Sequence, residues 1–297
     1  MTETRFVARF RAVARRVLRA PVGAFLRARE PFVARRFSHE LAICAIFREE
    51  AAFLDEWIAF HVGVGATHFY LYDNGSTDNC RAVLQPWRDK GFVTLIDWPG
   101  AVQQLAAYTH CVQNAALDCR WLAFLDIDEF LFSPKANDIR PILRQYQDLP
   151  GIAVWQAFFG SAGRQARSDV PVTLAYRTRA ALADCTSVKT IANPRRVYKA
   201  GVHTFKFWGG EARDTARRRL VPGMPATVDT LRINHYWSRS LEDLGTKIAR
   251  GDASTDALRD AEWHYAFERT LNTESDETIV PIAQNVLAAC ISMRSRT

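Results

Sequence analysis

The stretch Trp-Leu-Ala-Phe-Leu-Asp-Ile-Asp-Glu-Phe-Leu-Phe, residues 121–132, places three carboxylates inside an otherwise apolar run. A continuous apolar run is typical of a strand covered on both faces, so residues 121–125 are predicted to form a buried strand. In open parallel sheets, ligands bind beyond the carboxyl ends of the strands. Asp126 and Asp128 follow this strand directly, and their oxygen atoms suit a divalent cation that could neutralise a diphosphate. An isolated Asp-x-Asp is also common in ordinary turns, so the interpretation depends on its place in the fold.

The composition of the chain limits its size class and its partners. With 297 residues and 48% hydrophobic content, the chain can bury one substantial core, or one core with a smaller appendage. The net charge of +7 is uneven, because residues 1–37 hold ten arginines and only two acids, which leaves −1 for the rest. A nearly neutral body is not expected to bind nucleic acid.

The cysteines and the hydropathy pattern indicate a cytoplasmic protein. Six cysteines are spread along the chain without a Cys-x-x-Cys pair, which favours buried, reduced thiols. The sequence contains no stretch of about 18 apolar residues, so no transmembrane helix is expected. Arginines recur through the first residues, which is unlike a secretory signal.

The arginine-rich tail has the pattern of an amphipathic helix over residues 5–19. Phe6, Phe10, Val13 and Val17 follow helical spacing, and the arginines fall on the opposite face. Such a helix suits the surface of an anionic membrane, which would place the protein on the inner face. A solvated extension, or a helix docked on the body, fits the same pattern.

Strands and helices alternate in the body, which predicts a mostly parallel central sheet. The expected strands are 41–47, 67–72, 92–96 and 121–125. Three helices separate them: one over 49–64, one that follows the turn at 73–78 and ends at about residue 89, and one over 103–117. Further strands are expected at 151–159 and 231–236, strand pieces at 187–198 and 201–207, and helices at 139–146, 241–250, about 261–271 and 282–293. A Gly-x-Gly-x-x-Gly loop does not follow the first strand, so a dinucleotide fingerprint is absent.

A set of short motifs resembles the bacterial glycosyltransferase family 2-like proteins related to glycosyltransferase family 92. The motifs are Glu49-Glu50, Glu56-Trp57, His61, Asp73-Asn74-x-Ser76-x-Asp78, Gln104-x-x-Ala107-Tyr108, Asp126-x-Asp128-Glu129-Phe130, Ser187-Val188-Lys189, Gly201-Val202-His203, and His235-Tyr236 followed by Ser240 and Lys247. The resemblance covers roughly residues 40–251. It implies an α/β, GT-A-type catalytic domain over 38–240, after the tail of residues 1–37 and before a C-terminal helical segment over 241–297.

The resemblance also implies an activity and a set of ligands. Such a protein would be a hexosyltransferase-like enzyme that moves a sugar from a nucleotide-diphosphate donor to a glycan or lipid-linked acceptor, with Mn²⁺ or Mg²⁺ and with inversion. Asp126 and Asp128 match the family's metal-binding pair, and His235 is expected to be a C-terminal metal ligand, with His203 as its rival. Mn²⁺ accepts carboxylates together with an imidazole, so ligand chemistry does not choose between the two histidines. Asp73 matches the position that holds the nucleoside.

The sequence does not assign the catalytic base. An inverting transfer needs a carboxylate that removes the proton of the acceptor hydroxyl. Asp169, Asp184 and Glu211 lie in the region expected on the acceptor side, but none belongs to a motif. Lys189 is a candidate for binding the donor phosphates. The donor sugar, the acceptor and the oligomeric state stay open.

Two other functions fit parts of the pattern. A nucleotidyltransferase uses a similar sheet, metal and nucleotide, but usually has a Gly-rich, basic loop after the first strand, where this chain has Phe47-Arg48-Glu49-Glu50. A non-catalytic adaptor at the membrane surface would use the tail for lipid and the body for a partner. It would not bind nucleotides in a metal-dependent way.

Overall fold

The computed structural model describes residues 37–251 and 260–294 of the chain. The helix predicted over residues 5–19 lies outside the described residues. Within them, no helix is long and apolar enough to cross a lipid bilayer. The five cysteines whose side chains are described are buried and form no disulfide.

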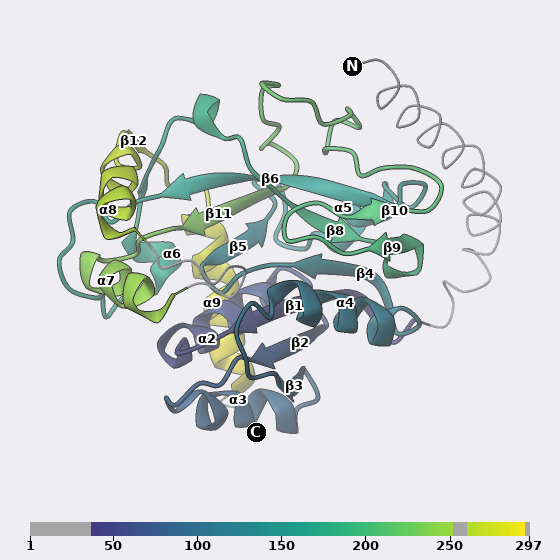
Figure 1. Cartoon of the computed structure of the whole chain (residues 1–297), viewed down its shortest axis with the longest axis horizontal. Helices are drawn as coiled ribbons and strands as arrows, with labels where there is room; N and C mark the ends of the chain where they lie inside the picture. The colour runs from purple at the N-terminus through teal and green to yellow at the C-terminus, as the bar shows by residue number, and fades with distance from the viewer. Residues whose placement is uncertain (1–36, 252–259, 295–297) are drawn as a thin grey trace, which may run out of the picture.

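Four parallel strands form the first half of the fold, as the sequence predicted (Figure 1). They lie side by side in the order β3-β2-β1-β4. Their bounds are β1 (His39–Phe47), β2 (His68–Asp73), β3 (Val93–Asp97) and β4 (Cys119–Phe124), and the helices between them are α2 (Ala51–Gly63), α3 (Cys80–Asp89) and α4 (Gln104–Ala115). All three pairings between these strands are parallel. The three helices therefore connect parallel strands, as the alternation of strands and helices in the sequence indicated.

The central strand β1 is apolar and buried from Leu41 to Phe47, because both faces of the sheet are covered there. Leu41, Ile43 and Ala45 belong to the core cluster that contains the buried side chains of α2. Ala42 and Cys44 point to the other cluster, which contains residues of α4. Since successive side chains of a strand alternate between faces, a strand buried on both sides has no polar position.

Antiparallel strands extend the sheet beyond β4. Strand β8 (Val188–Ala192) pairs antiparallel with both β4 and β6 (Gly151–Phe159). Strand β11 (Arg232–Tyr236) lies between β6 and β5 (Glu129–Phe132), parallel to the first and antiparallel to the second. The short elements are α5 (Arg140–Arg144), α6 (Val172–Ala175), β7 (Thr178–Arg179), β9 (Val197–Lys199), β10 (Lys206–Phe207) and β12 (Glu274–Ser275). The sheet is thus mixed: β3, β2, β1 and β4 form a parallel group on one side, and β6 and β11 are a further parallel pair beyond β8.

The strand pieces expected at 187–198 and 201–207 are shorter in the structure. Strand β8 ends at Ala192, and Pro194 begins a single 3₁₀ turn, Pro194–Arg196, before β9. Proline has no N–H to donate to a strand ladder, so a break at this position is expected. Only residues 206–207 of the second piece are extended, as β10.

Three helices follow β11: α7 (Leu241–Arg250), α8 (Ala261–Thr270) and α9 (Val280–Arg294). Helices α7 and α8 lie beside the carboxyl ends of β6 and β11, on the left in Figure 1. Helix α9 packs against α2, and Val286 comes so close to Gly63 that a side chain at that position would clash. The C-terminal helices therefore pack on the same body that carries the sheet.

Helix α2 fixes the acidic turn after β4 through two buried side chains. Trp57 Nε1 donates a hydrogen bond to the carbonyl of Glu129, at 2.9 Å. His61 is fully buried, and its Nε2 accepts from the amide of Leu131 at 3.1 Å. The other ring nitrogen, Nδ1, donates to the carbonyl of Trp57 at 2.8 Å. The imidazole is therefore neutral, and burial lowers its pKa from 6.5 to about 3.

We expect His61→Phe to destabilise the protein and to remove part of its acid sensitivity. Loss of both hydrogen bonds leaves the Leu131 amide without its partner, which costs about 2–3 kcal/mol. Because the folded pKa of His61 lies below the unfolded value, its stabilisation is complete above pH 6.5 and falls as the pH drops toward 3. The slope is about 1.4 kcal/mol per pH unit.

Urea unfolding at about pH 7 and about pH 5 measures this effect. The difference in unfolding free energy between wild type and variant should narrow by about 2 kcal/mol at the lower pH. An equal difference at both pH values would show that the imidazole is not buried in its neutral form.

Candidate active site

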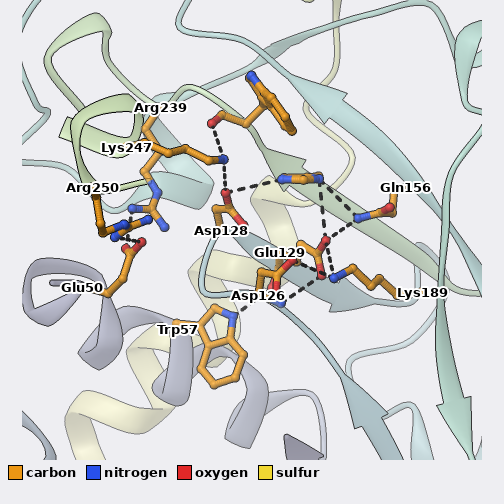
Figure 2. A network of polar contacts seen from close by, with 12 residues as sticks. Glu50, Trp57, Asp126, Asp128, Glu129, Gln156, Lys189, Arg239, Lys247 and Arg250 are labelled. Atoms are coloured by element: carbon orange, nitrogen blue, oxygen red, sulfur yellow. Dashed lines mark hydrogen bonds and ion pairs between the residues drawn. The ribbon is translucent and has the colours of Figure 1, made fainter. Parts of the chain in front are cut away.

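The acidic turn after β4 lies between one lysine on one side and three cations on the other (Figure 2). Asp126, Asp128 and Glu129 all project from this turn, which joins β4 to β5. Lys189 and Gln156 approach from the β8 and β6 side, whereas Lys247, Arg239 and Arg250 approach from the opposite side. The position predicted for the acidic residues, at the carboxyl end of a buried strand, is the observed one.

Asp126 is held by three side chains. Its Oδ2 forms an ion pair with Lys189 Nζ at 2.7 Å. Its Oδ1 accepts hydrogen bonds from Gln104 Nε2 at 3.1 Å and from the Tyr108 hydroxyl at 3.4 Å. The side chain nevertheless stays 33% exposed. Asp126 is therefore neutralised by Lys189 but can still be reached from solvent.

Asp128 is more deeply buried and is paired with a different lysine. Its Oδ2 lies 2.7 Å from Lys247 Nζ and 3.4 Å from His235 Nε2, and the side chain is 12% exposed. Burial alone would raise the pKa of Asp128, but Lys247, together with His235, outweighs it and holds the pKa well below the usual range. Asp128 is thus ionised, in contact with one ammonium and one imidazole.

His235 connects Asp128 to a second, inner group of side chains. Its Nδ1 lies 3.2 Å from Gln156 Nε2 and 3.6 Å from Glu129 Oε1. Burial lowers the pKa of His235, although Asp128 opposes this effect, so the ring is neutral near pH 7. The amide nitrogen of Gln156 donates, so Nδ1 accepts, and the neutral ring carries its proton on Nε2, which faces Asp128.

Glu129 is the innermost carboxylate of the turn. It is fully buried, accepts from the amide of Asp126 at 3.0 Å and from Gln156 Nε2, and lies 3.4 Å from Lys189 Nζ. Burial raises its pKa to about 8; Lys189 opposes this shift, whereas the two aspartates add to it. Glu129 therefore supports His235 and the turn from behind and does not face the cleft.

Cations line the cleft beside Asp128. Lys247 Nζ also donates to the carbonyl of Trp237 at 2.9 Å and lies 4.3 Å from the centre of its ring. Arg239 and Arg250 each contact Glu50, at 2.8 and 2.6 Å. Among the described residues, Nε and Nη2 of Arg239 are buried and have no hydrogen-bond partner. The guanidinium lies 3.5 Å from the centre of the Phe53 ring, and Arg239 lines the same cleft as Asp128 and Lys247.

Asp73 ends β2, next to the end of β1, as expected from the sequence. It is buried, and its Oδ1 accepts from the amide of Ser76 at 2.8 Å, which stabilises the turn over residues 73–78. The same turn holds the start of α2, because Asp78 accepts from the amide of Ala51 at 2.8 Å and Thr77 donates to Glu49. Asp73 thus has a structural role at the edge where nucleoside binding was predicted.

The two histidines proposed as metal ligands lie in different surroundings. His235 contacts Asp128, whereas His203 is exposed and its Nδ1 lies 3.2 Å from the carbonyl of Val188. The structure therefore places His235 in contact with Asp128, whereas His203 lies within electrostatic reach of Asp126 and, among the described residues, forms no hydrogen bond or ion pair with either aspartate.

The three candidates for the catalytic base lie on the surface or in surface ion pairs. Asp169 and Asp184 are exposed, and Glu211 pairs with Arg213 and Arg219. In the described part of the chain, none of the three forms a hydrogen bond or ion pair with Asp126, Asp128 or His235. The catalytic base stays unassigned.

Several residues of the site had no assigned role in the sequence analysis. These are Glu129, Gln156, Arg239, Lys247 and Arg250. Glu129 and Lys247 belonged to the recognised motifs, but a sequence motif does not show which side chains its residues contact. The signal that could have drawn attention to Arg239 and Arg250 is the gathering of these two arginines and Lys247 within residues 239–250, shortly after the strand that carries His235. Gln156, on β6, has no such local signal.

Comparison with known proteins identifies the family of the chain. The model of glycosyltransferase family 92 matches residues 39–289. The glycosyltransferase family 92 protein Os08g0121900 of Oryza sativa is 35% identical over 151 residues, which are 50% of this chain and 26% of the rice protein. The galactan beta-1,4-galactosyltransferase GALS2 of Arabidopsis thaliana is 27% identical over 188 residues, which are 56% of this chain and 35% of that protein.

The chain therefore spans about a quarter to a third of the length of these plant relatives. Among solved structures, S. aureus TarS 1-349 is 10% identical, with coverage of 76% of this chain and 68% of that chain and a TM-score of 0.41. A TM-score this low supports no comparison of the two sites. The family model, in contrast, spans most of the chain, and the protein belongs to glycosyltransferase family 92.

Proposed function

We propose that this chain transfers a sugar from a nucleoside-diphosphate donor to a hydroxyl of a glycan or lipid-linked acceptor. The observation that carries the proposal is the pairing of Asp128 with His235 at the end of β4, next to Lys247 and Arg239, in a member of glycosyltransferase family 92. Because a relative is named a galactan beta-1,4-galactosyltransferase, UDP-galactose is the first donor to test. The proposed transfer is inverting.

The donor set beside Asp128 fits Mn²⁺ or Mg²⁺, which we propose as the cofactor. Asp128 Oδ2 and His235 Nε2 lie 3.4 Å apart. Binding of an ion at Nε2 would move the ring proton to Nδ1, where Glu129 Oε1, 3.6 Å away, would accept it. A carboxylate and an imidazole are a ligand pair that Mn²⁺ accepts. Asp126 is the proposed further ligand. When bound, the ion would stabilise the charge that develops on the leaving diphosphate.

Lys247 occupies the place where such an ion would contact Asp128. As the side chains stand, no group of three His, Cys, Asp or Glu residues in the described ranges is arranged around a metal. The ammonium of Lys247 contacts the same oxygen that faces His235. We therefore propose that Lys247 leaves Asp128 when the donor binds and pairs with a donor phosphate. Arg239, with its unpaired nitrogens, would bind the same diphosphate.

The alternative functions receive less support from the site. A nucleotidyltransferase would use a basic, Gly-rich loop after β1, but Glu49 and Glu50 stand there and pair with Thr77, Arg239 and Arg250. A non-catalytic adaptor would not need two ionised carboxylates next to unpaired guanidinium donors, because such groups are costly to bury.

We expect Mn²⁺ to strengthen UDP binding at least about tenfold, and Asp128→Asn and His235→Ala to remove that gain. Both substitutions take away a donor atom that the ion needs. Isothermal calorimetry with UDP, in the presence and absence of Mn²⁺, measures the effect. Glu211→Gln, which changes an acidic residue in a surface ion pair, is the matched control and should keep the gain. If Mn²⁺ does not change the UDP affinity of the wild-type chain, the proposed metal site is wrong.

Lys247→Met should change the affinities for metal and nucleotide in opposite directions. Without nucleotide, Mn²⁺ should bind more tightly, because the competing ammonium is gone. UDP should bind about tenfold more weakly, because a charge-assisted contact to a phosphate is lost. Calorimetric titration of each ligand alone separates the two effects. Lys199→Met, at an exposed position, is the control, and a fall in both affinities for Lys247→Met would contradict competition.

We further propose that residues 5–19 bind the inner face of an anionic membrane and bring the site near its acceptor. Arginines on one face and Phe and Val on the other suit such a surface. In liposome flotation, the full chain should bind anionic vesicles at low salt, and a version that starts at Ser38 should not. Equal binding of both proteins would remove this proposal.

A further inference from the structure

A strip of aromatic rings leads from the candidate active site to the surface of α8. We define the aromatic strip as Phe158, Trp237, Phe267 and Trp263. Its inner end contacts His235, whose ring centre lies 4.9 Å from that of Phe158 and 5.5 Å from that of Trp237. Trp237 lies 5.1 Å from Phe267, which stacks on Trp263 at 5.2 Å with an angle of 9° between the rings. The strip is therefore continuous from strand β6 and the end of β11 to the face of α8.

The two ends of the aromatic strip have different exposures. Trp263, at the outer end, is 51% exposed, whereas Trp237 and Phe267 are partly buried. Trp237 also lines the cleft that contains Asp128 and Lys247. An apolar surface of large rings thus begins in solvent and ends at the proposed reaction centre. Among the described residues, the indole N–H of Trp237 is buried and has no hydrogen-bond partner.

Polar contacts hold α8 firmly over the end of β6. The buried Glu268 accepts hydrogen bonds from the amide and the hydroxyl of Ser161, at 3.0 and 2.6 Å. Asn272 accepts from the amide of Ala162 at 2.7 Å. At the other end of the helix, the Asp260 side chain accepts from the amide of Trp263. These contacts fix the rings of the strip before any ligand arrives, which lowers the entropic cost of binding.

Packing of α8 on the body explains only part of the aromatic strip. Phe267 and Trp237 contribute to that packing, since they are partly buried against Phe158. Trp263 adds a large ring whose surface is half in solvent, where a smaller or polar residue would be less costly. Half-exposed tryptophans are typical of binding surfaces, because the ring contributes a large contact area and its conformational cost is low.

We infer that the aromatic strip is the subsite for the acceptor and that it binds neutral sugar rings of a glycan. A pyranose presents a face of C–H groups that packs on an aromatic ring, while its hydroxyls stay hydrated or hydrogen-bonded. Trp263, which stacks on Phe267 and is half exposed, offers the flat apolar surface that such a ring needs. The Trp237 ring, in contrast, already packs against Lys247 Nζ and stacks on His264. The inner end of the strip would bring an acceptor hydroxyl toward His235 and Asp128. This inference rests on the proposed sugar transfer, and it assigns the acceptor side of the same site.

The test compares glycan binding by the wild-type chain, Trp263→Ala, Trp263→Phe and Tyr265→Ala. Tyr265 is the matched control: it lies on the same helix and is 36% exposed, but it faces Gly245 of α7 and has no ring contact with the strip. An array of neutral oligosaccharides that includes β-1,4-galactotetraose identifies a ligand, and calorimetry then gives its Kd. Thermal unfolding checks that each variant is folded.

We expect Trp263→Ala to weaken glycan binding at least about tenfold, as loss of a half-buried ring from an interface does. Trp263→Phe should stay within about threefold of the wild type, and Tyr265→Ala should bind as the wild type does. The inference is overturned if the wild-type chain binds no glycan of the array, or if Trp263→Ala binds as tightly as the wild type. UDP titrations of the same samples test the donor site independently. Loss of UDP binding would count against the sugar-transfer proposal, whereas UDP binding without glycan binding would count against the acceptor subsite alone.

Discussion

Neutralisation of the three carboxylates in the turn after β4 is the constraint on which the rest of the site depends. Asp126, Asp128 and Glu129 lie within four residues, and their side chains are between fully buried and 33% exposed. Buried like charges repel each other and lose hydration, so burial raises the pKa of Glu129 to about 8, and the two aspartates are stabilised by cations. Lys189 comes from β8 and Lys247 from α7, 63 and 119 residues further along the chain than their partners. The antiparallel strands and the C-terminal helices therefore have to pack where they do for the parallel half to carry its acidic turn.

The same turn explains why some recognised motif residues have no contact with the proposed ligands. Trp57 and His61 lie on α2, and both bind backbone groups of β5 rather than a carboxylate. These two side chains form hydrogen bonds with backbone groups of β5 that a neighbouring strand would otherwise form: Trp57 donates to the carbonyl of Glu129, and His61 accepts from the amide of Leu131. Residues of a recognised motif can thus hold the backbone of a site in place without touching a ligand. His61 suits this role because it is fully buried and its lowered pKa keeps the imidazole neutral.

The parallel half and the place of the acidic turn could be predicted because their signals are local. An apolar run such as residues 41–47 and the short helical repeats between strands indicate a parallel sheet without any knowledge of distant contacts. The position of Asp126 after β4 follows from the same pattern. Insertion of β11 between β5 and β6 could not be read in this way, because pairing between distant strands has no local period. The choice between His203 and His235 depended on that insertion, since only β11 brings an imidazole to Asp128. Pairing of Lys247 with Asp128 was equally hidden, because α7 contributes it from a separate helix.

Charge balance gives a reason why a lysine should stand in a proposed metal site. Asp126 and Asp128 together carry two negative charges, and Lys189 and Lys247 supply two positive ones within 2.7 Å of them. A free divalent ion would bring two further positive charges to two aspartates that are already neutralised, beside Arg239 and Arg250, which share the single Glu50, so it should bind weakly by itself. A divalent ion that arrives with the two negative charges of a nucleotide-sugar diphosphate adds no net charge. In that exchange Lys247 would leave a carboxylate for a phosphate and keep a full ionic partner, which avoids the penalty of an unpaired buried charge. The pairing seen here is thus compatible with the proposed cofactor and ties its binding to that of the donor.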